Sequence, residues 1–154
     1  MKMNGEYTTF SESETAALGE KIAAELSEGD IVAFIGNLGA GKTTMIKAIA
    51  SALGADERET ASPSFALVHD YGPIRLESKE DVGRIFHIDL YRLEPGEIEQ
   101  LGLWEILDED NICFVEWADK YPEIIPRGAV RIDITRTGED VRTIIIKDWN
   151  SDEH

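Results

Sequence analysis

The residues with the clearest chemistry form a glycine-rich segment at residues 36–43, which reads GNLGAGKT. This segment matches the phosphate-binding pattern G-x-x-x-x-G-K-[ST] at every required position. Glycines let backbone N–H groups surround a triphosphate, because no Cβ atom blocks its approach. We expect the Lys42 ammonium group to reach the β- and γ-phosphates and the Thr43 hydroxyl to ligate Mg²⁺. The predicted nucleotide contacts in this loop are Asn37, Leu38, Gly39, Ala40, Gly41, Lys42, Thr43 and Thr44.

The segments on either side of the loop support this interpretation. Residues 31–35 form an apolar run that is typical of a strand buried on both faces. After the loop, apolar residues recur with helical spacing at Ile46, Ile49, Ala50 and Leu53. Gly54 then provides a C-terminal cap for the helix. Strand, loop and helix therefore follow in the order that a nucleotide-phosphate site requires, with the helix N-terminus directed at the phosphates.

Two acidic residues could complete the site. Asp89 follows the strand-like run 84–88, and Glu116 follows the longer apolar run 112–115. Carboxylates at the ends of strands near the loop can hold Mg²⁺, directly or through water, or orient the attacking water. We predict that Asp89 and Glu116 both serve the metal and catalysis together with Lys42. The pattern favours Glu116 for the central strand and leaves the division of roles open.

Other polar and aromatic residues are less specific. Ser62 belongs to a Ser-Pro-Ser segment at residues 62–64 that could sense the γ-phosphate, although a plain turn explains it equally well. Trp117 directly follows Glu116 and could flank the nucleotide. We interpret His87 as a partly buried histidine with satisfied hydrogen bonds. The other two tryptophans, Trp104 and Trp149, are expected to be packing residues.

The elements that must position these residues indicate a mixed α/β sheet in a single domain spanning residues 1–154. Ser11 and Glu14 form a capping-box pattern that opens a helix, which we expect to end at Gly29. Further strands are expected at residues 7–10, 65–71, 83–90 and 111–116, a broken helix from Pro95 to Leu107, and an antiparallel hairpin at 130–135 and 141–147. The expected fold is a P-loop sheet with a parallel core, flanking antiparallel strands and helices on both faces.

Composition limits the classes of partner. The formal net charge is -16, from 31 acidic and 15 basic residues, so autonomous binding to nucleic acid or anionic lipid is not expected. Residues 1–10 lack a signal-peptide pattern, and no apolar run approaches the roughly 20 residues that cross a bilayer. The single cysteine, Cys113, lies in an apolar run and is expected in the core. We therefore expect a cytoplasmic protein that has no contact with membranes.

Four motifs in order make a more specific pattern than the loop alone. They are the loop at 36–44, Ser-Pro-Ser-Phe at 62–65, His-Ile-Asp-Leu-Tyr-Arg-Leu at 87–93, and Val-Glu-Trp at 115–117. In this combination the chain resembles the TsaE (YjeE) family, the small bacterial ATPases of threonylcarbamoyladenosine tRNA modification. The resemblance covers about residues 8–147. Asn37 stands where aspartate is common in the family, and Ser64 stands where threonine is common.

The resemblance implies an ATPase that is slow alone and that acts on a complex of TsaD and TsaB. Hydrolysis would reset that complex during modification of adenosine 37, with the tRNA held by the partners. Carried onto this chain, Lys42 and Thr43 would bind phosphate and Mg²⁺, residues 62–64 would form a switch-like loop, and Trp117 would lie close to the nucleotide. Asp89 and Glu116 would be the acidic site residues.

Rival functions remain for such a loop. A small-molecule kinase needs a basic lid, and here the basic residues are scattered. A small GTPase is disfavoured because the chain has no Asn-Lys-x-Asp stretch to read guanine. A nucleotide-gated binding module without useful hydrolysis is the third alternative. Arg58, Arg75 and Arg92 are the candidates for an arginine finger, but each is more simply a structural or solvated residue, so we expect the partner complex to complete the catalytic site.

Overall fold

The computed structural model describes residues 1–37, 39–56, 68–75, 83–91, 93–94, 96–100, 102–107 and 110–150. In chain order the elements are β1 (Gly5–Thr9), α1 (Glu12–Ala23), β2 (Ile31–Ile35), α2 (Lys42–Ala52), β3 (Val68–Pro73), β4 (Arg84–Asp89), α4 (Glu97–Gln100), α5 (Leu103–Ile106), β5 (Ile112–Glu116), the 3-10 turns η1 (Ala118–Lys120) and η2 (Pro122–Ile124), β6 (Val130–Arg136) and β7 (Arg142–Asp148). None of the helices in this described part is long and apolar enough to cross a membrane.

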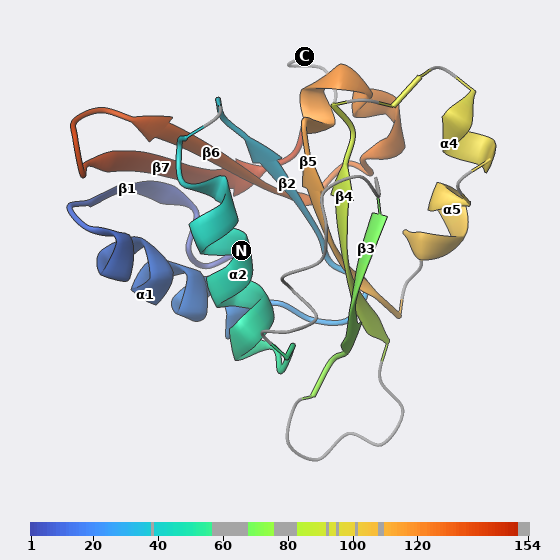
Figure 1. The fold of residues 1–154 in the computed structure, drawn as a ribbon, viewed down its shortest axis with the longest axis horizontal. Helices are drawn as coiled ribbons and strands as arrows, with labels where there is room; N and C mark the ends of the chain where they lie inside the picture. Colours follow the sequence, from blue (N-terminus) through green and yellow to red (C-terminus); the bar gives the residue numbers. More distant parts are fainter. Residues whose placement is uncertain are drawn as a thin grey trace.

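One seven-stranded sheet has the order β1-β7-β6-β2-β5-β4-β3 (Figure 1). Its four central strands, β6, β2, β5 and β4, pair in parallel. The strands toward both edges pair antiparallel: β3 with β4, β7 with β6, and β1 with β7. The predicted P-loop α/β sheet, with a parallel core and flanking antiparallel strands, is therefore confirmed, and so is the C-terminal hairpin.

The sheet separates two hydrophobic cores, and β2 contributes to both. Val32 and Phe34 belong to the core under α1 and α2, whereas Ile31 and Ala33 belong to the core on the opposite face. This division follows from the alternation of side chains along a strand. Figure 1 shows α1 and α2 side by side on one face. The opposite core also contains Leu103 of α5, Ala118 of η1 and Ile124 of η2.

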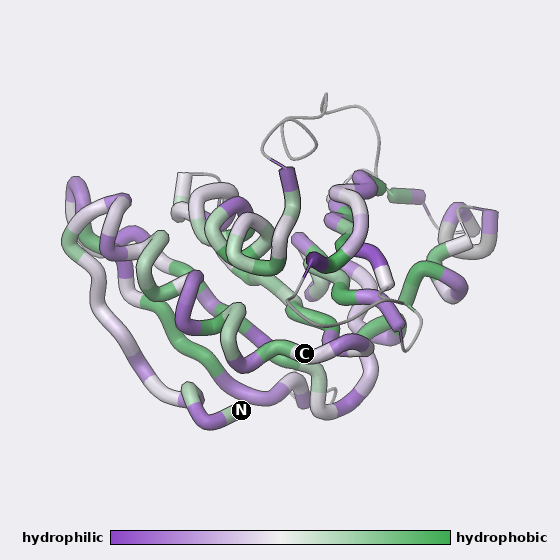
Figure 2. The backbone as a smooth tube through the Cα atoms, turned by 90° about the horizontal axis from the view of Figure 1, so that it is seen from below, coloured by the Kyte–Doolittle hydropathy of each residue, from purple (hydrophilic) through white to green (hydrophobic). Residues whose placement is uncertain are grey.

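The distribution of hydropathy agrees with this layered arrangement. In Figure 2 the hydrophobic stretches lie mainly along the strands and on the helix turns that meet them, while hydrophilic residues lie mostly in outer turns. Cys113 lies inside the sheet as predicted, and burial raises the pKa of its thiol to about 12. Cys113 is therefore a core residue rather than a reactive thiol.

The helix α1 begins as predicted but ends earlier. The Ser11 side chain accepts a hydrogen bond from the Glu14 backbone N–H at 3.1 Å, which caps the N-terminus. The predicted end at Gly29 is wrong, since the helix ends at Ala23. Beyond it the N–H groups of residues 25 and 26 bond to carbonyl groups three residues back, which tightens the chain into turns.

Trp149 and Trp104, which were both expected to be packing residues, differ in their environment. Trp149 is 1% exposed and packs in the core, as predicted. The prediction for Trp104 is wrong, because this side chain is 56% exposed. Helix α5 buries Leu103, and successive helical residues point about 100° apart, so the next side chain turns toward solvent. A sequence without the fold does not reveal which side of such a short helix is covered.

Candidate functional site

The phosphate-binding segment occupies the connection between β2 and α2. Strand β2 ends at Ile35 and helix α2 begins at Lys42, so residues 36–41 form the loop. Gly39 and Gly41 have φ angles of 79° and 104°, in the left-handed region that favours glycine. Leu38, a predicted nucleotide contact, lies outside the described residues. The local structure is therefore the strand–loop–helix unit that the motif predicts.

The loop and helix α2 fit a bound anion. A Cβ atom at Gly36 would lie 2.6 Å from the backbone oxygen of Ile134, so only glycine lets the loop pass this close to β6. No side chain caps the N-terminus of α2, and its first turn contains no acidic residue. The N–H groups and the positive end of an 11-residue helix are thus available to phosphate oxygens.

Lys42 is buried within the site rather than extended into solvent. Its side chain is 6% exposed, and its Nζ atom donates a hydrogen bond to the Gly36 carbonyl oxygen at 2.6 Å. Nζ also lies 3.8 Å from Oε1 of Glu116 and 4.7 Å from the centre of the Trp117 ring. An ammonium group in this position carries the positive charge that phosphate binding needs, and it connects the loop to the end of β5.

Glu116 ends the strand that pairs directly with the strand preceding the loop. In the sheet register it lies opposite Phe34 of β2, and its side chain is 13% exposed. Burial alone would raise the pKa of the Glu116 carboxyl. The hydrogen bond from His87 and the charge of Lys42 bring this pKa below the usual value of 4.5. Glu116 is therefore a partly buried carboxylate that stays ionised at neutral pH.

Asp89 lies beside Glu116 at the same edge of the sheet. The two residues are register partners on the parallel strands β4 and β5, so their side chains share one face. Oδ1 of Asp89 accepts a hydrogen bond from the backbone N–H of Tyr91 at 2.9 Å. Asp89 stands one strand farther from the loop than Glu116. The structure thus brings the two predicted carboxylates together and gives Glu116 the more central strand, as the pattern favoured.

These residues could hold Mg²⁺ only with help from a nucleotide. The described residues contain no group of three or more His, Cys, Asp or Glu side chains that would bind a metal by themselves. Magnesium commonly uses one or two protein groups, waters and substrate phosphates, so such a group is not required. Thr43 lies exposed in the first turn of α2, close to the loop, whereas the hydroxyl of Thr44 donates to Glu12 at 3.0 Å. Thr43, Asp89 and Glu116 remain the predicted metal-binding residues.

Trp117 has an unusual backbone conformation that directs its ring toward the loop. Its φ angle is 58°, the only positive φ of a non-glycine residue in the described part of the chain. The residue lies between the end of β5 and the turn η1. Its ring lies 4.8 Å from that of Tyr91, centre to centre, and close to Lys42. A strained tryptophan in this place supports the predicted position next to the nucleotide.

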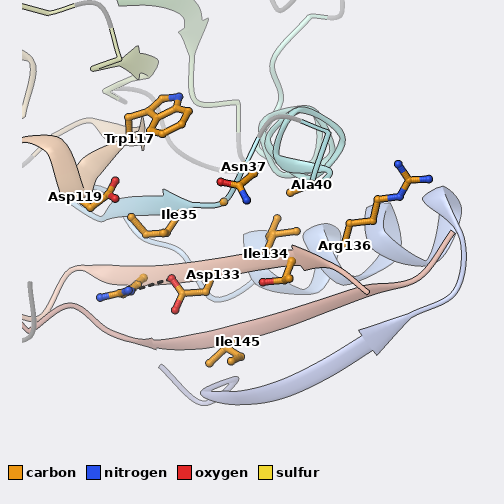
Figure 3. A pocket seen from close by; sticks show the side chains of 12 residues that line it. Ile35, Asn37, Ala40, Trp117, Asp119, Asp133, Ile134, Arg136 and Ile145 are labelled. Carbon is orange, nitrogen blue, oxygen red and sulfur yellow. Dashed lines mark hydrogen bonds and ion pairs between the residues drawn. The ribbon is translucent and has the colours of Figure 1, made fainter. Parts of the chain in front are cut away.

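A cavity of about 510 Å³ opens beside the loop (Figure 3). Asn37, Ala40 and Trp117, three of the predicted nucleotide contacts, line it together with residues of β6. Within it Arg131 donates a hydrogen bond to Asp133 at 2.9 Å. The volume is in the range of small-molecule sites. A second cavity of about 220 Å³ on the side of α1 is lined by Ser11, Glu12, Thr15, Gly41, Thr44, Asp140 and Arg142.

His87 is partly buried with both ring nitrogens hydrogen-bonded, as predicted, but sequence reasoning gave it no part in the site and missed Tyr71 and Arg142 altogether. The Tyr71 hydroxyl forms a hydrogen bond with His87 at 2.6 Å, and His87 in turn forms a hydrogen bond with Glu116 at 2.7 Å. Arg142, at the start of β7, lies with its Nη2 atom 3.5 Å from the Gly39 carbonyl oxygen of the loop. The spacing of His87 two residues before Asp89 was a signal, since both point to one face of β4. No local signal indicated Tyr71 or Arg142, because the sheet order brings them to the site.

Some predicted residues cannot be placed. Ser62, the rest of the 62–64 segment, Arg58 and Arg92 all lie outside the described residues. Arg75 is described, and it serves the structure: its backbone N–H donates to the Leu53 carbonyl at 2.9 Å. A Cβ atom at Gly54 would lie 2.5 Å from the Cβ of Arg75, so the two segments pack closely. The backbone of Arg75 thus packs against the end of α2, while its side chain is exposed, as expected for a structural or solvated arginine.

Comparison with known proteins identifies similar chains over most of this length. The family model described as "Threonylcarbamoyl adenosine biosynthesis protein TsaE" matches residues 9–144. A Bacillus subtilis protein named "tRNA threonylcarbamoyladenosine biosynthesis protein TsaE" is 37% identical over 138 residues, covering 90% of this chain and 82% of that protein. An Aquifex aeolicus protein of the same name is 36% identical over 121 residues, covering 78% of this chain and 81% of that protein.

A solved structure is also similar. The crystal structure of Bacillus subtilis YdiB matches with a TM-score of 0.73 and 30% sequence identity. The match covers 97% of this chain and 88% of the YdiB chain. Sequence and fold therefore point to the same relatives.

Proposed function

Since the chain belongs to the TsaE family, we propose that it binds and hydrolyses ATP with Mg²⁺ in tRNA threonylcarbamoyladenosine biosynthesis. Family membership establishes the role in tRNA threonylcarbamoyladenosine biosynthesis. The ATPase activity is our proposal, and one observation carries it. The loop lysine, Lys42, lies 3.8 Å from Glu116, a partly buried carboxylate at the end of the adjacent parallel strand. Phosphoryl-transfer sites combine a phosphate-binding cation with a carboxylate in this way.

Each residue of the site has a definite part in this proposal. The backbone N–H groups of the loop and the first turn of α2 bind the phosphates, and Lys42 neutralises their charge. Trp117 and the cavity beside the loop are positioned to hold the rest of the nucleotide. Glu116 and Asp89 orient the attacking water or retain the metal at the edge of the sheet. Binding requires Lys42 to exchange its contacts with Gly36 and Glu116 for phosphate oxygens.

Magnesium fits the chemistry of the residues present. The Thr43 hydroxyl and the carboxylates of Asp89 and Glu116 are oxygen ligands, which Mg²⁺ prefers, and together they would hold it next to the loop. When bound, Mg²⁺ supplies positive charge that offsets the charge developing on the transferred phosphoryl group. The chain is otherwise strongly acidic, with a net charge of -16, so a local excess of positive charge is needed at this site.

We further propose that the partners are TsaD and TsaB, as the family resemblance implies, and that the tRNA is held by them. The charge of this chain repels the phosphate backbone of RNA. Turnover is then slow for the isolated chain and faster in the assembly, because the partners complete the site. A phosphoryl transferase for small molecules and a nucleotide-gated binding module are the two alternatives that the experiment must separate.

The test is a hydrolysis assay with the purified chain, alone and with a TsaD–TsaB complex. We expect phosphate release from ATP that requires Mg²⁺ and increases when the complex is added. Lys42→Ala should abolish it, whereas Lys47→Ala, on the exposed side of the same helix, should not. Binding without hydrolysis, under all conditions, would support the binding module instead. Transfer of the phosphoryl group to a small molecule, detected by mass spectrometry, would support a kinase.

A further inference from the structure

A chain of hydrogen bonds crosses three adjacent strands and ends at the loop. The hydroxyl of Tyr71 on β3 lies 2.6 Å from Nδ1 of His87 on β4, and Nε2 of His87 lies 2.7 Å from Oε2 of Glu116 on β5. The other oxygen of Glu116, Oε1, lies 3.8 Å from Nζ of Lys42. The two oxygens of the Glu116 carboxylate thus face different partners, His87 and Lys42.

The geometry determines which nitrogen of His87 carries a proton. Without a proton on Nε2, its lone pair would face the carboxylate oxygen at 2.7 Å, which is repulsive. Nε2 therefore donates to Glu116. Burial, and the nearby charge of Glu116, raise the pKa of Tyr71 to about 12, so its hydroxyl keeps its proton and can donate to Nδ1. The tautomer with its proton on Nε2 satisfies both bonds, and the carboxylate of Glu116, which can only accept, selects it.

We propose that His87 is a positioning residue for ATP hydrolysis, which holds the Glu116 carboxylate so that Oε1 faces the phosphate loop, while Tyr71 fixes the imidazole ring. The inference rests on the proposed function. His87 and Glu116 are each 13% exposed, so water competes little for these bonds. The role is that of a group behind a reactive carboxylate or metal ligand, which orients it without touching the substrate.

Free rotation of the carboxylate is the alternative that His87 prevents. Lys42 already has a second acceptor, the Gly36 carbonyl at 2.6 Å, so the lysine alone does not fix the orientation of Glu116. Without the donor from His87, either oxygen could turn toward the loop, and the productive orientation would be occupied for less of the time. The loss should therefore fall on kcat rather than on KM.

Two substitutions at His87 separate its two bonds. Glutamine places an amide N–H near the position of Nε2, so His87→Gln preserves the donor to Glu116. Asparagine places its amide near the position of Nδ1, so His87→Asn preserves the contact with Tyr71 and removes the donor. We expect kcat of His87→Asn to fall about 10–100-fold, with KM changed less than about threefold, and His87→Gln to recover most of kcat.

The matched control is His69→Asn. His69 is the register partner of His87 on β3, and their ring centres lie 5.7 Å apart, so the substitution removes a neighbouring imidazole, including its charge near Glu116, and changes neither His87 nor Glu116. We expect kcat within about threefold of the original chain. Thermal unfolding of every variant, measured with and without Mg²⁺ and ATP, shows that the compared proteins are folded.

A second readout does not depend on turnover. In ¹⁵N-labelled protein at neutral pH, the imidazole resonances of His87 should show the proton on Nε2, and Tyr71→Phe, which removes only the partner of Nδ1, should leave that proton in place while shifting the Nδ1 resonance. An Nε2 atom without a proton in the unsubstituted chain, or equal kcat for His87→Asn and the unsubstituted chain, would overturn the proposal. If the original chain with its partners shows no Mg²⁺-dependent hydrolysis, the proposed function itself fails, and the positioning role fails with it.

Discussion

Asp89 and Glu116 are register partners at the ends of two adjacent parallel strands, so the sheet places both carboxylates at one edge and on one face. Glu116 is on the strand next to β2, and Asp89 is one strand farther away.

We predict that Glu116→Gln lowers kcat by about 100-fold or more, since Glu116 is closer to the loop. We predict that Asp89→Asn chiefly raises the Mg²⁺ concentration needed for turnover. Hydrolysis rates measured over a range of Mg²⁺ concentrations test both. Glu25→Gln, remote from the site, is the control. Unchanged Mg²⁺ dependence and turnover in both variants would exclude the pair from the site.

Lys42→Ala should remove nucleotide binding. The Lys42 side chain is 6% exposed, so in Lys42→Ala a cation from the solvent cannot easily take the place of the missing ammonium group. We expect the Kd for ATP with Mg²⁺ to rise at least tenfold, which corresponds to about 1.4 kcal/mol. Isothermal titration calorimetry measures the change. Lys47→Ala should bind as the original chain does, and an unaltered Kd for Lys42→Ala would show that the loop does not bind phosphate.

Arg142 should support the loop from β7. Its Nη2 atom lies 3.5 Å from the Gly39 carbonyl oxygen, and its Nε atom lies 3.4 Å from the position of a Cβ atom on Gly41. We expect Arg142→Ala to weaken ATP binding about tenfold, since it removes both a cation near the phosphates and a contact that holds the loop. The same calorimetric titration applies. Arg127→Ala, an exposed arginine between η2 and β6, should not change the Kd.

Trp117 should report nucleotide binding by its fluorescence. Lys42 lies 4.7 Å from the centre of the ring, and binding must redirect this ammonium group toward phosphate. We expect ATP with Mg²⁺ to change the tryptophan emission of the original chain and of Trp104→Phe, whose indole is exposed on α5. The change should disappear in Trp117→Phe. An equal response in that variant would place the signal at another tryptophan.

The lowered pKa of Glu116 predicts how its contribution to stability depends on pH. A carboxyl whose pKa is lower in the folded than in the unfolded chain stabilises the fold above the unfolded value, here about 4.5, and loses this contribution as pH falls through the folded pKa. The difference in free energy of unfolding between the original chain and Glu116→Gln should therefore shrink below about pH 4.5. Urea unfolding of both proteins between about pH 7 and pH 3 measures it. A constant difference across this range would contradict the ion pairing of Glu116.

Those parts of the site whose geometry is local could be predicted from the amino-acid sequence. The strand 31–35, the glycine loop and helix α2 are contiguous, so hydrophobic periodicity and the loop pattern were sufficient to predict them. The C-terminal hairpin was equally accessible, because alternation and a tight turn specify antiparallel pairing between neighbouring segments. The candidate carboxylates were found since each follows an apolar strand directly.

Which residues meet across the sheet depends on the order of its strands and became visible only in the folded chain. The order β2-β5-β4-β3 brings Tyr71, His87 and Glu116 into one chain of hydrogen bonds, and the position of β7 brings Arg142 to the loop. Strand order depends on the summed packing of both cores, and no single segment carries that information. For this reason a histidine that pattern alone presented as an ordinary buried residue became, in the fold, the partner of the central carboxylate.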